Sequence, residues 1–303
     1  MAIHQHRIGD LLWRRFVILL PYSWLLLFFL VPFAIVFKIS FSDPIVAQPP
    51  FTALFDHSQN LLNRFQGSLN NYLFLLEDNL YWISYLRSIR VAGISTLLCL
   101  LLGYPMAYYI AQSLPTRRNL LLMLIILPFW TSFLLRVYAW MGILSTNGIL
   151  NSALLWMGLI EKPLQMLYTD FAVYIGIVYT YLPFMILPLY ANLERLDLEI
   201  HDAAADLGGK PLQVFWDITL PVSVPGIIAG SLLVFIPAMG EFVIPALLGG
   251  LDSLMIGRTL YDEFFVNRDW PLASAVATIL LLILILPMML FQRTQVSSTE
   301  SNP

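Results

Sequence analysis

Charged residues are missing from five long apolar stretches of this 303-residue chain. No Asp, Glu, Lys or Arg lies between Arg15 and Lys38, and the same holds for 91–116, 171–193, 218–240 and 270–292. A sixth stretch, 120–144, contains only Arg136. A helix needs about 20 apolar residues to cross a ~30 Å hydrocarbon core. The pattern therefore predicts six membrane-spanning helices, at about residues 17–37, 89–111, 120–143, 170–190, 225–248 and 272–291.

Two shorter elements are predicted outside these spans. The apolar run Ile149–Ile160 is too short to cross a membrane, and turn residues flank it on both sides, so it indicates an interfacial helix. The long connection Lys38–Ser88 is expected to hold a helix near Leu69–Leu76. Its length suits the docking of a partner protein.

Composition supports the membrane assignment and excludes several other classes. The chain is 59% hydrophobic and 12% charged, with a mean hydropathy of +0.76, which is outside the range of soluble domains. A net charge of -3 gives no sign of the excess positive charge that is typical of nucleic-acid-binding proteins. The single cysteine, Cys99, permits no internal disulfide, and no phosphate-binding loop or metal-ligand motif occurs. The sequence has no His/Asp/Glu cluster at catalytic spacing, which counts against an enzyme.

Arginine placement predicts the orientation in the membrane. Arg7, Arg14 and Arg15 precede the first span, and Arg117 and Arg118 lie in the tight connection between the second and third spans. Positive residues in short connections favour the cytoplasmic side. With six spans, both termini and the connection 191–224 are expected to be cytoplasmic. The first apolar run is too long for a cleaved signal peptide and is interpreted as a retained anchor.

The connection 191–224 has the pattern of two short helices around a turn. Asp197–Leu207 mixes alanines, leucines and acidic residues as an amphipathic helix does, and Gly208-Gly209 provides a helix stop. Pro211 is suited to the first turn of a second helix, which we expect to end at Pro221 and Pro225. Such a compact segment is suited to a socket on another protein.

This connection resembles the EAA signature of bacterial ABC importer permeases, in which Glu-Ala-Ala, Gly and Ile-x-Leu-Pro recur at fixed spacing. Asp202 stands where that family usually has Glu. The other positions of the motif match in register: Ala203, Ala204, Gly208, Ile218, Leu220 and Pro221. The resemblance implies that these seven residues form the coupling segment that contacts an ATPase.

Nearly the whole chain is similar to the type I ABC importer permeases, an all-α membrane fold with a cytoplasmic coupling helix between helices 4 and 5. Segments 128–141, 147–151 and 240–245 look most like polyamine importer permeases of the putrescine type. The resemblance implies a bacterial inner-membrane subunit in a single permease domain. It also implies a second permease, two cytoplasmic ATPases that carry ATP and Mg, and a periplasmic polyamine-binding protein. No cofactor is expected in this chain.

A passage for putrescine or spermidine should offer carboxylates and aromatic faces to a polycation. Glu241 lies about sixteen residues into the predicted fifth span, a depth at which an ionisable residue is a functional candidate. Pro237, Gly240 and Pro245 would loosen the helix around it. Three roles remain open: contact with substrate, a structural ion pair with Arg136, and snorkelling at the lipid surface.

Aromatic residues in the spans are further candidates for the passage, although each also suits packing or an interfacial belt. They are Tyr104, Tyr108, Trp130, Tyr179 and Tyr181. In the last external connection, acidic residues outnumber basic ones and could form an acidic vestibule, or simply a solvated loop. They are Asp252, Asp262, Glu263 and Asp269.

Two other functions remain as alternatives. The same architecture could carry an amino acid, an oxyanion or iron, and Arg136 would suit an oxyanion. An ion-coupled secondary transporter would need no ATPase, but the segment Asp202–Pro221 would then have no explanation.

Overall fold

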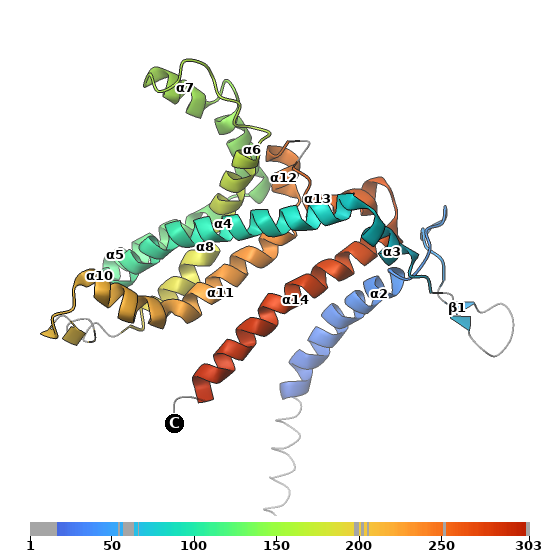
Figure 1. Cartoon of the computed structure of the whole chain (residues 1–303), viewed down its shortest axis with the longest axis horizontal. Coiled ribbons are helices and arrows are strands. Elements are labelled where there is room, and N and C mark those ends of the chain that lie inside the picture. Colours follow the sequence, from blue (N-terminus) through green and yellow to red (C-terminus); the bar gives the residue numbers. More distant parts are fainter. Residues whose placement is uncertain are drawn as a thin grey trace, which may run out of the picture. The chain divides into compact units, whose positions relative to one another are not determined.

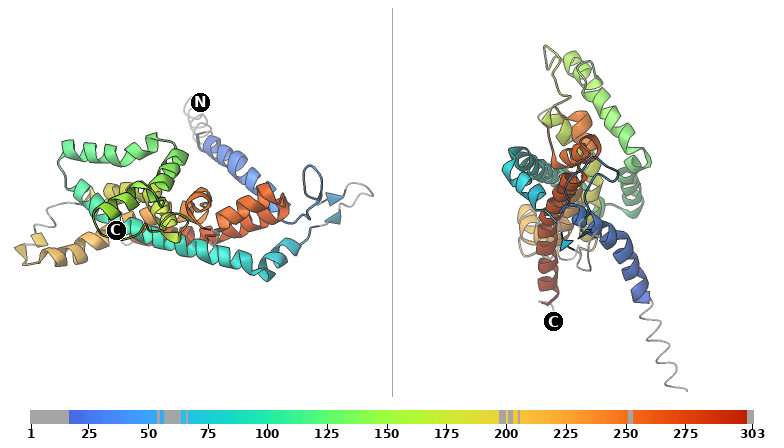
Figure 2. Two further views of the ribbon diagram at one scale, coloured as in Figure 1. Left: turned by 90° about the horizontal axis from the view of Figure 1, so that it is seen from above. Right: turned by 90° about the vertical axis from the view of Figure 1, so that its right-hand side faces the viewer.

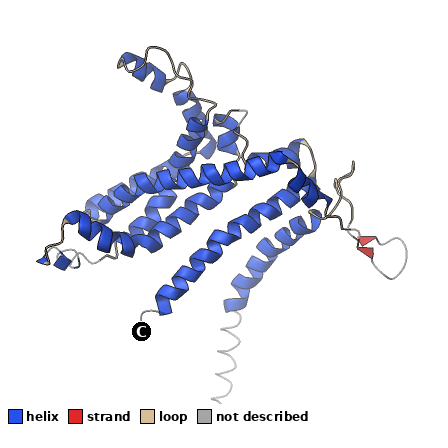
Figure 3. Cartoon of the chain, viewed as in Figure 1, coloured by secondary structure: helices blue, strands red, loops and turns tan. Residues whose placement is uncertain are grey.

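The computed structural model describes residues 17–53, 55–56, 64–65, 67–196, 200, 203–204, 206–250 and 253–300. Helices dominate this part of the chain (Figure 3), and its two strands are only two residues long each. Six described helical segments are long and apolar enough to cross a membrane, which confirms the predicted all-α membrane class. They are Val17–Ile39, Asn79–Ala111, Phe133–Trp156, Asp170–Leu193, Pro211–Met239 and Trp270–Met289.

Contacts divide the chain into two units, of which the first contains Met1–Asp78 and Asp262–Leu281. It holds η1 (Leu26–Leu30), α2 (Val31–Ile39), the antiparallel strands β1 (Phe55–Asp56) and β2 (Arg64–Phe65), α3 (Asn70–Glu77) and η4 (Asp262–Val266), together with the start of α14 (Trp270–Glu300). The helix predicted near residues 69–76 is confirmed as α3. The buried Asn71 amide fixes it by donating to the carbonyl oxygens of Ser40 and Ser42, both at 2.9 Å.

The second unit contains Asn79–Tyr261 and the end of α14. Its centre is formed by α4 (Asn79–Ala111), α8 (Asp170–Leu193) and α11 (Leu220–Met239), which lie side by side in Figures 1 and 2. Small residues permit the close approach: a Cβ atom added at Gly230 of α11 would lie 2.8 Å from the Met185 sulfur of α8. Cys99 is fully buried in this core.

The third span is not the single helix expected at residues 120–143. Residues 115–144 instead form α5 (Pro115–Ile126), the 3₁₀ turn η2 (Leu127–Trp130) and α6 (Phe133–Leu144), and the third candidate span, Phe133–Trp156, begins only at α6. Thr131 and Ser132, which separate the last two, have extended backbone. Pro128 lies inside η2, where its missing N–H and ring favour an interruption. An apolar sequence pattern does not reveal such a break, because both parts remain equally apolar.

The predicted short helix is present as α7 (Ile149–Trp156), which lies beyond the end of α6 in Figure 1 and forms the last part of the candidate span Phe133–Trp156. Its anchor is Asn151, whose side chain is fully buried. The Asn151 amide donates to the carbonyl oxygens of Ser145 and Leu164, and its oxygen accepts from the Leu164 N–H at 2.8 Å. One buried amide thus closes the connections on both sides of the helix.

The fifth span begins earlier and ends earlier than the predicted 225–248. A continuous helical segment runs through α10 (Pro211–Val214), the π turn η3 (Phe215–Thr219) and α11. The expectation that Pro221 and Pro225 end the short helix is therefore wrong. Pro221 lies in the first turn of α11, directly after the wide turn in which the Leu220 N–H bonds to the Phe215 carbonyl. Reorganised bonding of this kind accommodates a missing N–H.

Candidate functional site

The far end of this helical segment is interrupted. Helix α11 stops at Met239, the chain passes through Gly240, Glu241 and Phe242, and α12 (Val243–Leu248) then begins. Helix α13 (Ile256–Tyr261) crosses the interruption at very short range. A Cβ atom at Gly257 would lie only 2.3 Å from the Gly240 carbonyl oxygen. Glycine is therefore required at position 257 by the backbone of the break itself.

Glu241 lies inside this break and has its hydrogen bonds satisfied. The residue is only 8% exposed. The Tyr181 hydroxyl of α8 donates to one carboxylate oxygen at 2.6 Å. The backbone N–H groups of Val243 and Ile244 donate to the other oxygen at 3.0 and 3.3 Å. The carboxylate therefore caps the first turn of α12 and joins it to α8, which is a structural role.

Arg136 is not the partner of Glu241. The ion pairs found among the described residues are Arg87–Asp170 and Arg118–Glu194. The Arg136 guanidinium lies instead over the rings of Phe129 and Phe133, 5.6 and 5.9 Å from their centroids. The predicted Arg136–Glu241 pair is thus absent from this structure. Its premise was a continuous third helix, and the break before Phe133 removes that premise.

The five aromatic candidates do not converge on one passage. Tyr181 binds Glu241, and Tyr179 packs edge-on against Trp140 of α6 with ring centroids 5.4 Å apart. Trp130 is 77% exposed. Tyr104 and Tyr108 lie on α4 at the opposite end of α11, against Phe215. Two of the five therefore belong to the neighbourhood of the coupling segment, which their sequence positions alone did not indicate.

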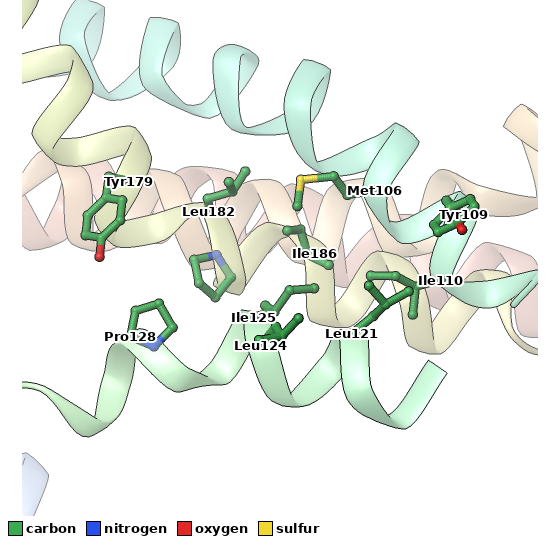
Figure 4. A pocket seen from close by; sticks show the side chains of 11 residues that line it. Met106, Tyr109, Ile110, Leu121, Leu124, Ile125, Pro128, Tyr179, Leu182 and Ile186 are labelled. Carbon is green, nitrogen blue, oxygen red and sulfur yellow. The ribbon is translucent and has the colours of Figure 1, made fainter. Parts of the chain in front are cut away.

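An apolar pocket lies between α4, α8 and the segment α5–η2, with a volume of about 340 Å³ (Figure 4). Tyr179 is the only aromatic passage candidate that lines it, and no acidic or basic side chain does. The pocket therefore offers no carboxylate to a cation. Its lining residues are Met106, Tyr109, Ile110, Leu121, Leu124, Ile125, Pro128, Tyr179, Leu182, Pro183 and Ile186.

A second, polar pocket of about 730 Å³ lies near the start of α8, and it was not predicted from the sequence. Arg87 and Asp170 form an ion pair at 2.6 Å on its wall, and the Ser253 hydroxyl donates to the same Asp170 oxygen at 3.0 Å. Arg258 of α13 also lines it. Arg87 and Asp170 flank different spans, so only the fold brings them together.

Two carboxylates of the predicted acidic vestibule, those of Glu263 and Asp269, are engaged in local hydrogen bonds. Asp252 lies outside the described residues. Glu263 is 9% exposed and accepts a hydrogen bond from the Asn267 amide at 2.9 Å. Asp269 accepts from the Leu272 N–H at 2.9 Å and so caps the start of α14. Asp269 therefore stabilises a helix start, and Glu263 is bound to a side chain four residues along the sequence.

The coupling segment has the turn that its glycines predicted. Gly208 adopts φ +87°, the left-handed conformation that favours glycine, and the Gly209 N–H bonds back to the Ala204 carbonyl at 3.0 Å. Asp202, the first residue of the motif, lies outside the described residues. The Gln213 side chain accepts from the Lys210 N–H at 3.1 Å and caps α10.

Three large apolar side chains of this segment face outward. Leu207 is 91% exposed, Leu212 73% and Trp216 61%. Six residues of the EAA-like motif are described. Ala204, Ile218 and Leu220 are half-buried, whereas Ala203, Gly208 and Pro221 are exposed. We call Leu207, Leu212 and Trp216 the docking surface. Apolar residues that gather at one exposed loop indicate an interaction site.

Comparisons with known proteins agree with this architecture. Residues 99–300 match the family described as binding-protein-dependent transport system inner membrane component. The chain is 41% identical to the spermidine/putrescine transport system permease protein PotB of Haemophilus influenzae, over 90% of this chain and 91% of that protein. It is 46% identical to PotB of Escherichia coli K12, over 75% and 82% respectively.

Solved structures support the same fold. A bacterial ABC transporter involved in the import of the acidic polysaccharide alginate superposes with a TM-score of 0.67, over 95% of this chain and 99% of that chain. The sequence identity in this comparison is 17%, so the likeness concerns the fold alone.

Proposed function

Because the chain belongs to the family of binding-protein-dependent transport system inner membrane components, we propose that it is a permease subunit of an ATP-driven importer of polyamines. The observation that carries the proposal is the identity of 41% to a spermidine/putrescine permease over 90% of this chain. The cargo would be putrescine, spermidine or both, delivered by a periplasmic binding protein. The passage would form together with a second permease in a bacterial inner membrane.

The docking surface supports an ATPase partner. Leu207, Leu212 and Trp216 expose apolar area on a segment that has its own turn and helix cap, so the exposure does not come from a loosely packed loop. The sequence contains no phosphate-binding loop, so in an ATP-driven importer the hydrolysis would be expected on partner chains. We propose that the docking surface lies on the cytoplasmic side together with both termini, as the arginines before the first span and in the connection 112–119 predict.

The cargo proposal does not depend on Glu241. Tyr181 and two backbone N–H groups already bind its carboxylate, so a polyamine would have to displace these bonds. Aromatic faces remain available for an ammonium group, among them Tyr179 and the exposed Trp130. An attraction of about 0.5–2 kcal/mol per ring is expected from such faces. We assign Glu241 to holding the break and leave cation contact to the rings.

Transport in a defined system tests the proposal. The chain would be reconstituted in proteoliposomes with the second permease, the ATPase subunits and the binding protein of its own organism. We expect uptake of radiolabelled putrescine or spermidine that requires ATP and the binding protein, and that excess unlabelled polyamine suppresses. Uptake driven by an ion gradient without ATP would contradict the importer class. ATP-driven uptake of an amino acid or oxyanion, with no polyamine uptake, would contradict the cargo.

The docking surface has its own test with a matched control. Leu212→Asp places a charge where the ATPase is expected to bind, and it should reduce co-purified ATPase severely while the permease still folds. Leu114, in the connection after α4, is 69% exposed and so is comparable to Leu212 at 73%. Leu114→Asp should leave ATPase binding unchanged. Equal binding by both variants would remove the docking surface from the interface.

A further inference from the structure

We propose that the ring of Phe215, held against Tyr104 and Tyr108, couples the docking surface to α4, so that α4 moves with the coupling segment. The inference rests on the proposed ATPase partner and deepens it. Covalent continuity already joins the coupling segment to α11. The new element is a second connection, made through side chains, to a different membrane-spanning helix.

The contact is formed by three rings. Tyr104 and Tyr108 are four residues apart on α4 and therefore lie on the same face of that helix. The Phe215 ring packs edge-on against both, with centroid distances of 5.7 and 6.4 Å and interplanar angles of 86° and 88°. Edge-to-face geometry in this distance range is the attractive arrangement of aromatic pairs. Phe215 thus contacts two successive turns of α4.

A partly buried hydrogen bond fixes the same contact from the other side. The Tyr104 hydroxyl lies 3.0 Å from the hydroxyl of Ser223, a fully buried residue in the second turn of α11. Ser223 donates its own proton to the Leu220 carbonyl at 2.8 Å. Because that proton is used, the Tyr104 hydroxyl donates to Ser223. Tyr104 is therefore held in place by Phe215 and by Ser223 together.

The neighbouring residue shows that the placement of Phe215 is selective. Trp216 follows directly and packs against Phe215 with a centroid distance of 5.7 Å, yet it is 61% exposed and belongs to the docking surface. One ring of the pair therefore points outward and the next points to α4. A force applied at Trp216 reaches Tyr104 and Tyr108 through a continuous set of ring contacts.

The test removes the ring and measures coupling separately from binding. In Phe215→Ala, we expect the ATPase to co-purify at the normal ratio and to hydrolyse ATP, while putrescine uptake per ATP falls about tenfold, within the range of coupling between linked sites. Phe215→Tyr, which keeps the ring, should keep putrescine uptake per ATP near the wild-type value. Tyr108→Leu, on the opposite helix and outside the docking surface, should reproduce the loss.

A second measurement does not depend on the cargo. Spin labels at Tyr109 on α4 and at the exposed Asp217 in η3, in a Cys99→Ala background, report whether the two segments move together. The wild-type chain should keep one narrow distance distribution with and without ATP and vanadate, and Phe215→Ala should broaden it. If no polyamine uptake occurs but these distributions behave as expected, the proposed cargo fails and the coupling stands.

Two results would overturn the inference. Normal uptake per ATP in Phe215→Ala would show that the ring contact carries no coupling. Loss of bound ATPase in Phe215→Ala or Tyr108→Leu would assign the rings to the docking interface instead.

Discussion

The two ends of the helical segment 211–239 differ in whether their side chains are buried by the chain itself. At the Met239 end, a carboxylate is buried, accepts three hydrogen bonds and lies beside a glycine that leaves no free space. At the Pro211 end, Leu212 and Trp216 remain largely exposed although the backbone around them is capped. The first end satisfies its polar groups within the chain. The second end leaves apolar area uncovered, and a partner protein would cover it.

This difference shows how to weigh the two kinds of candidate residue. A charged residue deep in a membrane protein is a functional candidate by default. Glu241 meets that criterion, but its bonds explain its presence without a ligand. Leu212 and Trp216 attract little attention in the sequence, and yet the structure leaves their side chains 73% and 61% exposed. The unsatisfied surface is therefore the better guide to function here.

The largest expected effect comes from closing the space at the Met239 end. Gly257→Ala would place a Cβ atom 2.3 Å from the Gly240 oxygen and 2.7 Å from its carbonyl carbon, and backbone atoms cannot rotate away. We expect a loss of about 3 kcal/mol or more in unfolding free energy, measured as melting temperature and yield in detergent. The control is Gly240→Ala, where nothing lies within 4 Å of the new Cβ. Similar losses in both variants would contradict the packing argument.

Removal of the Glu241 cap should have the second largest effect. Glu241→Ala leaves the Tyr181 hydroxyl and two N–H groups without their acceptor, at a cost of about 2–4 kcal/mol. Glu241→Gln keeps an acceptor oxygen and should cost less. Because Arg136 is not paired with Glu241, the effects of Glu241→Gln and Arg136→Gln should add. Recovery of stability in the double variant would instead indicate that Glu241 and Arg136 form an ion pair, contrary to the structure.

A smaller effect is expected at the ion pair between Arg118 and Glu194. Arg118 also donates to the Ala111 carbonyl at 3.0 Å, so it links the end of α4 to the end of α8. The two side chains are 24% and 40% exposed, and exposed pairs contribute at most about 1 kcal/mol. Arg118→Gln should lower the free energy of unfolding by at most about 1 kcal/mol, and by less at high salt, because salt screens the pair. Arg117→Gln, at an exposed neighbouring residue, should leave the free energy of unfolding unchanged.

The smallest effect on stability should come from the docking surface itself. Trp216→Ser removes a ring that is 61% exposed. The free energy of unfolding of the isolated permease should therefore stay within about 0.5 kcal/mol of the wild-type value. The same variant should bind the ATPase less tightly. A marked loss of stability in the isolated chain would mean that Trp216 supports the fold, and the contrast between the two ends would then weaken.

The sequence was informative where hydropathy and turn chemistry determine the structure. The apolar pattern predicted six spans, and the glycines after Leu207 predicted the left-handed turn at Gly208. Hydropathy could not locate the breaks at Thr131 and Gly240, because the chain on each side of them is equally apolar. Pro237 and Gly240 did indicate a loosened helix near Glu241, although they did not show where it ends.

Side-chain partners were the least predictable feature. Tyr104 and Tyr108 have the same local sequence setting as any aromatic pair in a spanning helix, and only the packing of α4 against η3 places them beside Phe215. The Arg136–Glu241 pair was inferred from similar depth in two continuous helices. Both helices are interrupted, so depth counted along the sequence did not correspond to position in space.

The π turn η3 also sets the helical phase of the coupling segment. Phe215 and Ser223 are eight positions apart, which on a regular α-helix would turn them about 80° away from each other. The π turn absorbs one residue, so they behave as if seven apart, within about 20° of alignment, and both reach Tyr104. A relative with a plain α-helix here would therefore need its aromatic residue seven positions before the serine, and a one-residue deletion inside the turn would leave the alignment intact.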